Sequence, residues 1–226
     1  ERGKGVFVEK PLATTYQQAK ELEELATEKK LPLMVGHIYL HCPGIQAIPV
    51  PVGPAEIYVK LLNPGPGPSA SSKDLRWAAL PHALALAIHF LGNPTKVWSY
   101  SPEANYIRVF ADYWNGSQAR IEVGNQTGRR VRAVELRVGN TRYCFDNAAP
   151  HAYWVQSGVD HRQGVDHRQY EMGNGEVLFL EMGAFLKAEG LGNDFLLHWQ
   201  ATPGPGPTAA EVRRLCDRRR GVGAAG

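Results

Sequence analysis

The sequence predicts the end of a parallel α/β domain followed by an α+β domain with a mainly antiparallel sheet. Two short strands, Val6–Glu9 and Leu33–Val35, are almost wholly apolar and flank one amphipathic helix. Strands of this kind belong to parallel sheets that are covered on both faces. Beyond Thr95 the chain is rich in strand-like runs separated by turn residues. A length of 226 residues allows one large domain or two small ones with a full hydrophobic core.

The first helix is predicted over Tyr16–Lys29, between the two apolar strands. Thr14 or Thr15 can cap its beginning, and Pro32 stops it before the second strand, which ends at Gly36-His37. Two strands cannot make a covered parallel sheet alone, so we expect this unit to be the last part of a larger one. The apolar stripe of the helix consists of Ala19, Leu22, Leu25 and Ala26.

The remaining elements follow from apolar runs and the turns between them. Asn115-Gly116 is the strongest hairpin signal, and Gly92 ends a long apolar helix. We interpret Asn140–Gln169 as irregular, with a tandem repeat of Val-Asp-His-Arg-Gln at 159–163 and 165–169. The predicted strands are Ala55–Leu62, Lys96–Ser101, Tyr106–Trp114, Gln118–Val123 and Ala133–Val138, and the predicted helices are Leu75–Leu91, Val177–Lys187 and Thr208 to about Arg219.

Composition and charge exclude several classes of function. The net charge is only +3, and the basic excess is concentrated in arginines 213–220, which fit a solvated helix end. The sequence lacks a basic stripe with interleaved aromatic residues, so we do not expect nucleic-acid binding. Apolar runs are too short for a membrane span of ~20 residues. The three cysteines are few and far apart, which favours a reducing compartment, so we expect a cytoplasmic protein. No pair of them has the spacing of metal ligands, so we expect no metal site.

Lys10 is the first candidate for chemistry, because it follows the first strand directly in Gly5-Val6-Phe7-Val8-Glu9-Lys10-Pro11. In α/β folds, ligands bind in the crevice at the carboxyl ends of strands. At the rim of an apolar site, a lysine becomes a positioned acid or a fixed charge near a developing alkoxide. A strand-end lysine that points to solvent fits the same residues, and the residues alone leave both interpretations open.

Histidines supply the other candidates. His82 lies on the apolar helical stretch, where it is either a core histidine or a catalytic one, and His89 lies two turns further on. His37 and His41 follow the second strand, with Tyr39 between them. The repeated Asp-His pairs at 160–161 and 166–167 fit a duplication in a loop better than a metal site.

These segments together resemble the Gfo/Idh/MocA family of NAD(P)-dependent oxidoreductases. The resemblance rests on the Glu9-Lys10-Pro11 segment, the helix after it and the run from Gly36-His37 to Pro43. It continues in the stretch from Trp77 to Gly92, and it is greatest to the branch that acts on nucleotide-activated sugars. The resemblance covers most of the chain, and the Glu-Lys-Pro segment is its most specific part.

The resemblance implies a fold and a reaction. It implies that 1–36 are the C-terminal part of a Rossmann-type nucleotide-binding domain and that 37–226 form an open-faced α+β domain for substrate binding and oligomerisation, with helices on one face. It implies hydride transfer between NAD or NADP and a hydroxyl or ketone of a sugar or sugar nucleotide, in a homo-oligomer formed through the sheet. By this resemblance Lys10 orients the reacting hydroxyl and His82 acts as acid or base. Glu9, Lys10, Pro11 and His37 then contact the cofactor, and Lys10, Tyr39 and His82 contact the substrate.

Two departures from the family pattern leave an alternative open. The sequence ahead of Lys10 holds no Gly-x-Gly-x-x-Gly, the glycine pattern that receives the pyrophosphate of a dinucleotide. Alanines stand at 78 and 83, where family members commonly carry an aspartate near the histidine. A non-catalytic binding or assembly subunit derived from the same family is therefore the alternative.

Overall fold

The computed structural model describes residues 5–64, 77–103, 105–128, 130–146, 152–157, 165–169, 181, 184 and 195–198. Contacts divide the chain into two units, one of 1–37 with 178–226 and one of 38–177. Residues 178–226, which we assigned to the second domain, are thus grouped with the first unit, and the predicted boundary after residue 36 stays a prediction. Within the described residues, no helix is long and apolar enough to cross a membrane.

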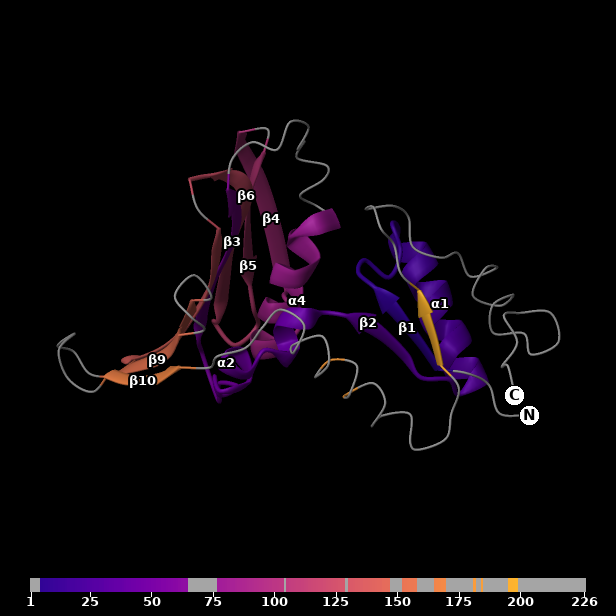
Figure 1. The fold of residues 1–226 in the computed structure, drawn as a ribbon, viewed down its shortest axis with the longest axis horizontal. Helices are drawn as coiled ribbons and strands as arrows, with labels where there is room; N and C mark the ends of the chain where they lie inside the picture. The colour runs from indigo at the N-terminus through magenta and orange to yellow at the C-terminus, as the bar shows by residue number, and fades with distance from the viewer. Residues whose placement is uncertain are drawn as a thin grey trace. The chain divides into compact units, whose positions relative to one another are not determined.

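Among its described residues, the first unit contains a small parallel sheet with helix α1 (Tyr16–Lys29) beside it (Figure 1). Strand β1 (Gly5–Glu9) pairs in parallel with β2 (Leu33–Gly36), and helix α1 (Tyr16–Lys29) connects them, as predicted. The side chain of Thr15 caps α1 by accepting the N–H of Gln18 at 3.3 Å. Leu22, which is 2% exposed, anchors the apolar stripe of the helix.

A third strand of this sheet comes from far along the chain. Strand β11 (Phe195–His198) pairs in parallel with the other edge of β1, so the order is β11-β1-β2. We predicted no strand there. A four-residue strand has too few residues for a clear periodic pattern, and only its pairing with a distant segment reveals it.

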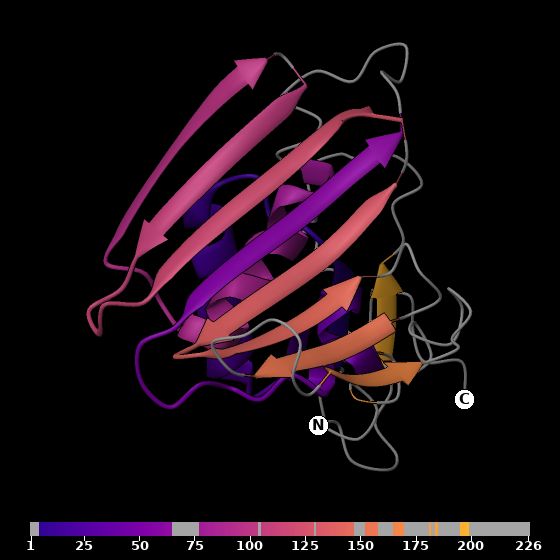
Figure 2. The same cartoon turned by 90° about the vertical axis from the view of Figure 1, so that its left-hand side faces the viewer.

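The second unit is built on an eight-stranded sheet with the order β10-β9-β8-β7-β3-β6-β5-β4 (Figure 2). Its pairs are antiparallel except β3 with β6. Its strands are β3 (Glu56–Pro64), β4 (Lys96–Glu103), β5 (Tyr106–Asp112), β6 (Gln118–Thr127), β7 (Val131–Val138), β8 (Thr141–Asp146), β9 (Ala152–Ser157) and β10 (Val165–Gln169). The predicted combination of a parallel unit and a mostly antiparallel sheet is therefore correct.

Strands β8, β9 and β10 correct the interpretation of Asn140–Gln169 as irregular. The second copy of the tandem repeat is itself β10, which pairs with β9. Strand preference depends on neighbours more than on the segment itself, and these short segments gain their order from successive antiparallel pairing with β7. The first repeat copy, most of the helix predicted at Val177–Lys187 and the helix predicted after Thr208 lie outside the described residues.

Turns and helix ends agree with the local signals. The predicted hairpin at Asn115-Gly116 joins β5 to β6, and Gly116 has a φ of 82°, which favours glycine. Helix α4 (Leu80–Leu91) ends at Gly92 as predicted. Pro81 lies in the first turn of α4, where its missing N–H has no helical partner to lose. Two short elements, the 3-10 helix η1 (Ile38–His41) and α2 (Pro43–Gln46), precede β3.

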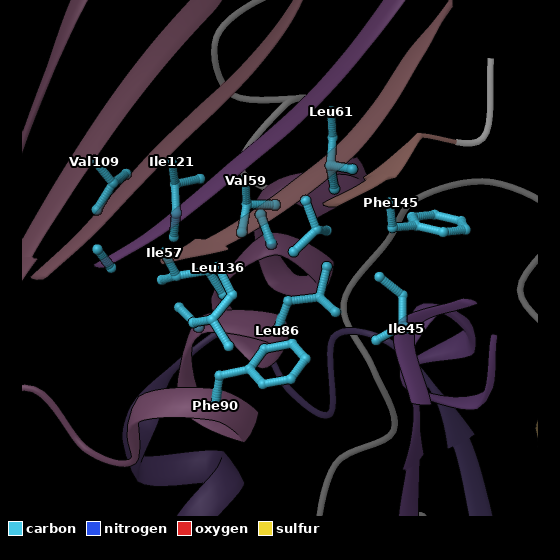
Figure 3. Close-up of a cluster of buried hydrophobic side chains, with 14 of the residues drawn as sticks. Ile45, Ile57, Val59, Leu61, Leu86, Phe90, Val109, Ile121, Leu136 and Phe145 are labelled. Atoms are coloured by element: carbon cyan, nitrogen blue, oxygen red, sulfur yellow. The ribbon is translucent and has the colours of Figure 1, made fainter. Parts of the chain in front are cut away.

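One face of the large sheet and helix α4 enclose the hydrophobic core (Figure 3). Alternate residues of β3, namely Ile57, Val59 and Leu61, point into it, as the two-residue period of a strand requires. Leu86 and Phe90 of α4 point into the core. Ile45 of α2 and Phe145 of β8 extend it.

The other face of the sheet is polar and aromatic, with one buried carboxylate at its centre. Glu122 on β6 is 2% exposed and accepts hydrogen bonds from Tyr58 at 2.7 Å and Tyr106 at 2.6 Å. Arg120 donates to it at 2.6 Å, and Arg108 lies 3.3 Å away. Although burial alone raises the pKa of Glu122, these donors and cations lower it to about 2. Burial, followed by the hydrogen bond to the same carboxylate, raises the pKa of Tyr106 to about 12.

Replacing Glu122 by glutamine is expected to destabilise the second unit at neutral pH. One pKa unit is worth about 1.4 kcal/mol, so a carboxylate with a pKa near 2 when folded contributes about 3 kcal/mol. Since the folded pKa is depressed, this contribution is present above the unfolded pKa of 4.5 and is lost as the pH falls through about 2. Urea unfolding should therefore separate the parent from Glu122→Gln at neutral pH and bring them together in strong acid. A separation independent of pH contradicts this account.

Candidate functional site

Two groups of predicted site residues occupy the two units, and each is described within its own unit. The first group lies at the carboxyl ends of β1 and β2. Glu9 is the last residue of β1 and pairs with Gly36, the last residue of β2, so the ends of both strands meet. Lys10 follows β1 directly, and its peptide bond to Pro11 is cis. The position is the edge of a parallel sheet where α/β proteins bind ligands.

Lys10 does not point freely into solvent. Its side chain is 14% exposed, and its Nζ lies 4.0 Å from Oε1 of Glu9. Burial lowers the pKa of Lys10, and the neighbouring Glu9 offsets part of the fall. Burial raises the pKa of Glu9, and Lys10 offsets part of that rise. Burial thus moves the pKa of the Glu9 carboxyl up and the pKa of the Lys10 ammonium down, so both move toward neutral pH. A pKa near the working pH favours proton transfer.

Gly36 allows Glu9 to approach the end of β2 closely. A Cβ atom on Gly36 would lie 3.0 Å from Oε2 of Glu9 and 3.2 Å from the ring of Phe7. A larger residue would have to displace one of these side chains. The glycine therefore leaves room for the Glu9 carboxylate at this position.

Glu181 lies with the first group of candidate residues and was not predicted. It comes from the second segment of the first unit, is 2% exposed, and accepts the backbone N–H of His37. Burial raises its pKa to about 7, and Glu9 adds to the rise. The signal available in the sequence was a single glutamate within the apolar run 177–185. Three titratable groups, Glu9, Lys10 and Glu181, thus gather at this edge of the first sheet.

The second group lies in the second unit, where η1 meets the beginning of α4. The rings of Tyr39 and His82 are in an edge-to-face contact, with centroids 5.1 Å apart and planes at 88°. Both side chains are half-buried. His89, two turns along α4, is exposed and contacts Phe90. His41 lies at the end of η1, and burial lowers its pKa.

Arg132 joins the second group and was also missed. It is 9% exposed, and its Nε donates to the hydroxyl of Tyr39 at 2.7 Å. Its two Nη atoms donate to the carbonyls of Leu62 and Val131 and to Oδ1 of Asn63, at 2.7, 2.8 and 2.5 Å. The predicted strand began at Ala133, one residue after Arg132, so an arginine on the inner face of β7 went unnoticed.

The structure thus brings together Glu9, Lys10 and His37 with Glu181 in one unit, and Tyr39 and His82 with Arg132 in the other. Each group combines a half-buried titratable side chain with polar partners that hold it in place. Within the described residues, His, Cys, Asp and Glu side chains form no group of three or more that could hold a metal ion.

Residues 1–37 match the model of an oxidoreductase family with an NAD-binding Rossmann fold, GFO_IDH_MocA. This range contains the whole of the first group, from Glu9 to His37, except Glu181. No curated protein matches the chain.

Solved structures share the fold over most of the chain. UDP-N-acetylglucosamine 3-dehydrogenase GnnA from Acidithiobacillus ferrooxidans is similar with a TM-score of 0.68 and 21% identity, over 80% of this chain and 60% of that one. A levoglucosan dehydrogenase, solved with NADH and L-sorbose, gives a TM-score of 0.69 and 15% identity, over 94% and 68%. An NAD binding oxidoreductase from Klebsiella pneumoniae gives 0.68 and 17%, over 84% and 65%.

The chain spans 60% of the length of the first of these structures. At identities of 15–21%, the likeness concerns the fold. It agrees with the predicted fold class, a Rossmann-type segment followed by a mostly antiparallel sheet. The family match thus covers residues 1–37, which contain the Glu-Lys-Pro segment, and the solved structures share the fold over 80–94% of the chain.

Proposed function

We propose that this chain belongs to an NAD(P)-dependent oxidoreductase that acts on a hydroxyl or ketone of a sugar or sugar nucleotide. The observation that carries the proposal is the half-buried Lys10 at the carboxyl end of β1, inside the range that matches the family model. The names of the similar structures, a UDP-N-acetylglucosamine dehydrogenase and a levoglucosan dehydrogenase, support a sugar substrate.

The residues at the ends of β1 and β2 fit the nicotinamide end of such a cofactor. Carboxylates at strand ends bind ribose hydroxyls in dinucleotide sites, and the approach of Glu9 to Gly36 presents a carboxylate at this edge. We assign Glu9, Lys10, Pro11 and His37 to contacts with NAD or NADP. When bound, the nicotinamide ring supplies the hydride acceptor or donor.

Lys10 and His82 have different roles toward the substrate. The ammonium of Lys10 orients the reacting hydroxyl and stabilises negative charge on its oxygen, aided by the low exposure of its side chain. His82 accepts or returns the hydroxyl proton, with Tyr39 packed against its ring as a further substrate contact. A positioned acid or base of this kind contributes about 10²–10⁴-fold to a rate.

We also propose that the protein is a cytoplasmic homo-oligomer that associates through the outer face of the large sheet. Exposed aromatic and arginine side chains gather there, a composition typical of the centres of protein interfaces. Trp98 is 42% exposed and stacks on Phe110 with centroids 5.6 Å apart, beside Tyr100 at 47% exposure. Arg108 and Arg120 lie over the rings of Tyr100 and Tyr58.

A non-catalytic binding or assembly subunit is the second candidate, favoured by one feature of α4. Ala83, the residue directly after His82, is fully buried in the core. An aspartate at this position would be buried there, whereas the alanine leaves His82 without a carboxylate on either neighbouring residue of the helix. A family member that kept this fold but lost the carboxylate beside its histidine would fit an assembly role.

Titration of the 226-residue chain with NADH and NADPH separates the two candidates. If the proposed function holds, nicotinamide fluorescence should change saturably, and Lys10→Ala should weaken the binding. Lys29→Ala is the matched control, because Lys29 is exposed and pairs with Glu28 on the helix surface. Full-strength binding by Lys10→Ala would remove Lys10 from the cofactor site, and no binding by the parent chain would favour the assembly subunit.

A further inference from the structure

Arg132 is a buried cation that the proposed reaction does not use. All four acceptors of its hydrogen bonds are neutral: the hydroxyl of Tyr39, two backbone carbonyls and the amide oxygen of Asn63. In the described part of the chain, no carboxylate oxygen lies within 4.0 Å of its guanidinium. Burial lowers the pKa of Arg132, which is the direction expected for a cation removed from water. A buried charge with neutral partners costs free energy, so its placement calls for a role.

The guanidinium of Arg132 connects Tyr39, which contacts His82, to the backbone of β3 and β7. Its rigid fork reaches three elements at once: η1 through Tyr39, the end of β3 through Leu62 and Asn63, and β7 through Val131. The pairing of β3 with β6 shifts register between Leu62 and Pro64, where a β-bulge can redirect carbonyls and side chains. Asn63 extends the network to Asn125 of β6 at 2.9 Å.

The contact with Tyr39 determines what its hydroxyl can do. The Nε–H of Arg132 occupies one lone pair of the hydroxyl oxygen and fixes the oxygen 2.7 Å away. The ring is then held with its plane nearly perpendicular to that of His82. Tyr39 is half-buried and packs against the core around α4. Loss of its hydrogen bond to Arg132 therefore shifts the tyrosine ring that contacts the imidazole of His82.

We propose that Arg132 is a positioning residue that sets the orientation of His82 through Tyr39. The proposal rests on the proposed function only for its consequence in catalysis, because the geometry belongs to the second unit alone. Arginine suits this role better than lysine, since the phenol, the Leu62 carbonyl and Asn63 are each bonded by a different nitrogen of one rigid plane, whereas an ammonium presents its donors from a single nitrogen.

The test is nuclear magnetic resonance of the imidazole of His82 in the 226-residue chain, assigned with His82→Gln. Tyr39→Phe removes the hydroxyl and keeps the ring, and Arg132→Met removes the guanidinium. We expect each to shift the His82 signals, and the double variant to shift them no further than the larger single change. Arg142→Met is the control, because Arg142 pairs with Glu135, which points to the outer face of the sheet. It should leave the His82 signals in place.

Two results would overturn the proposal: unmoved His82 signals in folded Tyr39→Phe, or additive shifts in the double variant. If Arg132→Met does not fold, Arg132→Lys takes its place, with a smaller shift expected and an unmoved signal counting against the proposal. In the protein at its natural length, Arg132→Met should lower kcat by about tenfold with little change in KM, the size of one lost hydrogen bond to a charged group. Moved signals without hydride transfer in the parent would reject the proposed reaction and keep the positioning role.

Discussion

Lys10→Ala is expected to lower the rate of hydride transfer by about 10²–10³-fold in the protein at its natural length, while the first unit stays folded. The residue lies at the end of β1 rather than within it, so its loss removes no strand pairing. Its side chain is 14% exposed and next to Glu9, and the truncation removes the cation that orients the hydroxyl and stabilises the developing alkoxide. The measurement is the change in nicotinamide absorbance under saturating cofactor.

Two further variants define what Lys10 contributes. Lys10→Arg keeps the positive charge but cannot release a proton at accessible pH, so partial activity with a flattened pH profile would identify a fixed charge. Lys29→Ala should retain the parent rate, because Lys29 is exposed on α1. A Lys10→Ala variant with the parent kcat and KM would remove Lys10 from the mechanism altogether.

Phe145→Ala is expected to lower the free energy of unfolding of the second unit by about 3–5 kcal/mol. Phe145 is 2% exposed and joins β8 to the core beside α2. Its ring approaches so closely that a Cβ atom on Gly44 would lie 2.5 Å from it. Removal of the ring leaves a cavity that a packed core fills only in part.

Urea unfolding of the chain measures this loss. Trp114→Ala serves as the matched control, because Trp114 is an aromatic residue at 85% exposure near the β5–β6 turn. It should change stability by less than about 0.5 kcal/mol. A loss of similar size in both variants would contradict the assignment of Phe145 to the core.

Local sequence signals were sufficient for elements whose structure depends on neighbouring residues. Helix α1 begins and ends as predicted because Thr15 caps it and its apolar stripe repeats with the helical period. The hairpin at Asn115-Gly116 was readable because glycine relieves the positive φ at that turn. In both cases the residues that decide the structure are neighbours in the sequence.

The short strands β8 to β11 were not predicted. Strand β11 is defined by its pairing with β1, and β8 to β10 by successive pairing onto β7. The candidate site follows the same division. Lys10 and His82 were candidates from their own segments and received roles only through the family resemblance, whereas Arg132 stands out only by its hydrogen bonds to Tyr39 and Asn63, 93 and 69 residues away in the sequence. Glu181 likewise meets His37 only in the folded first unit.

The most direct test of the central claim is the transfer of deuterium from a labelled sugar to the nicotinamide ring. The protein at its natural length would be incubated with NAD or NADP and a panel of sugars and sugar nucleotides deuterated at the oxidised carbon, and the cofactor analysed by mass spectrometry. The account predicts deuterium in the reduced cofactor for at least one member of the panel, with the label lost in Lys10→Ala and kept in Lys29→Ala. A protein that binds NADH saturably but transfers no deuterium from any of these substrates would contradict it.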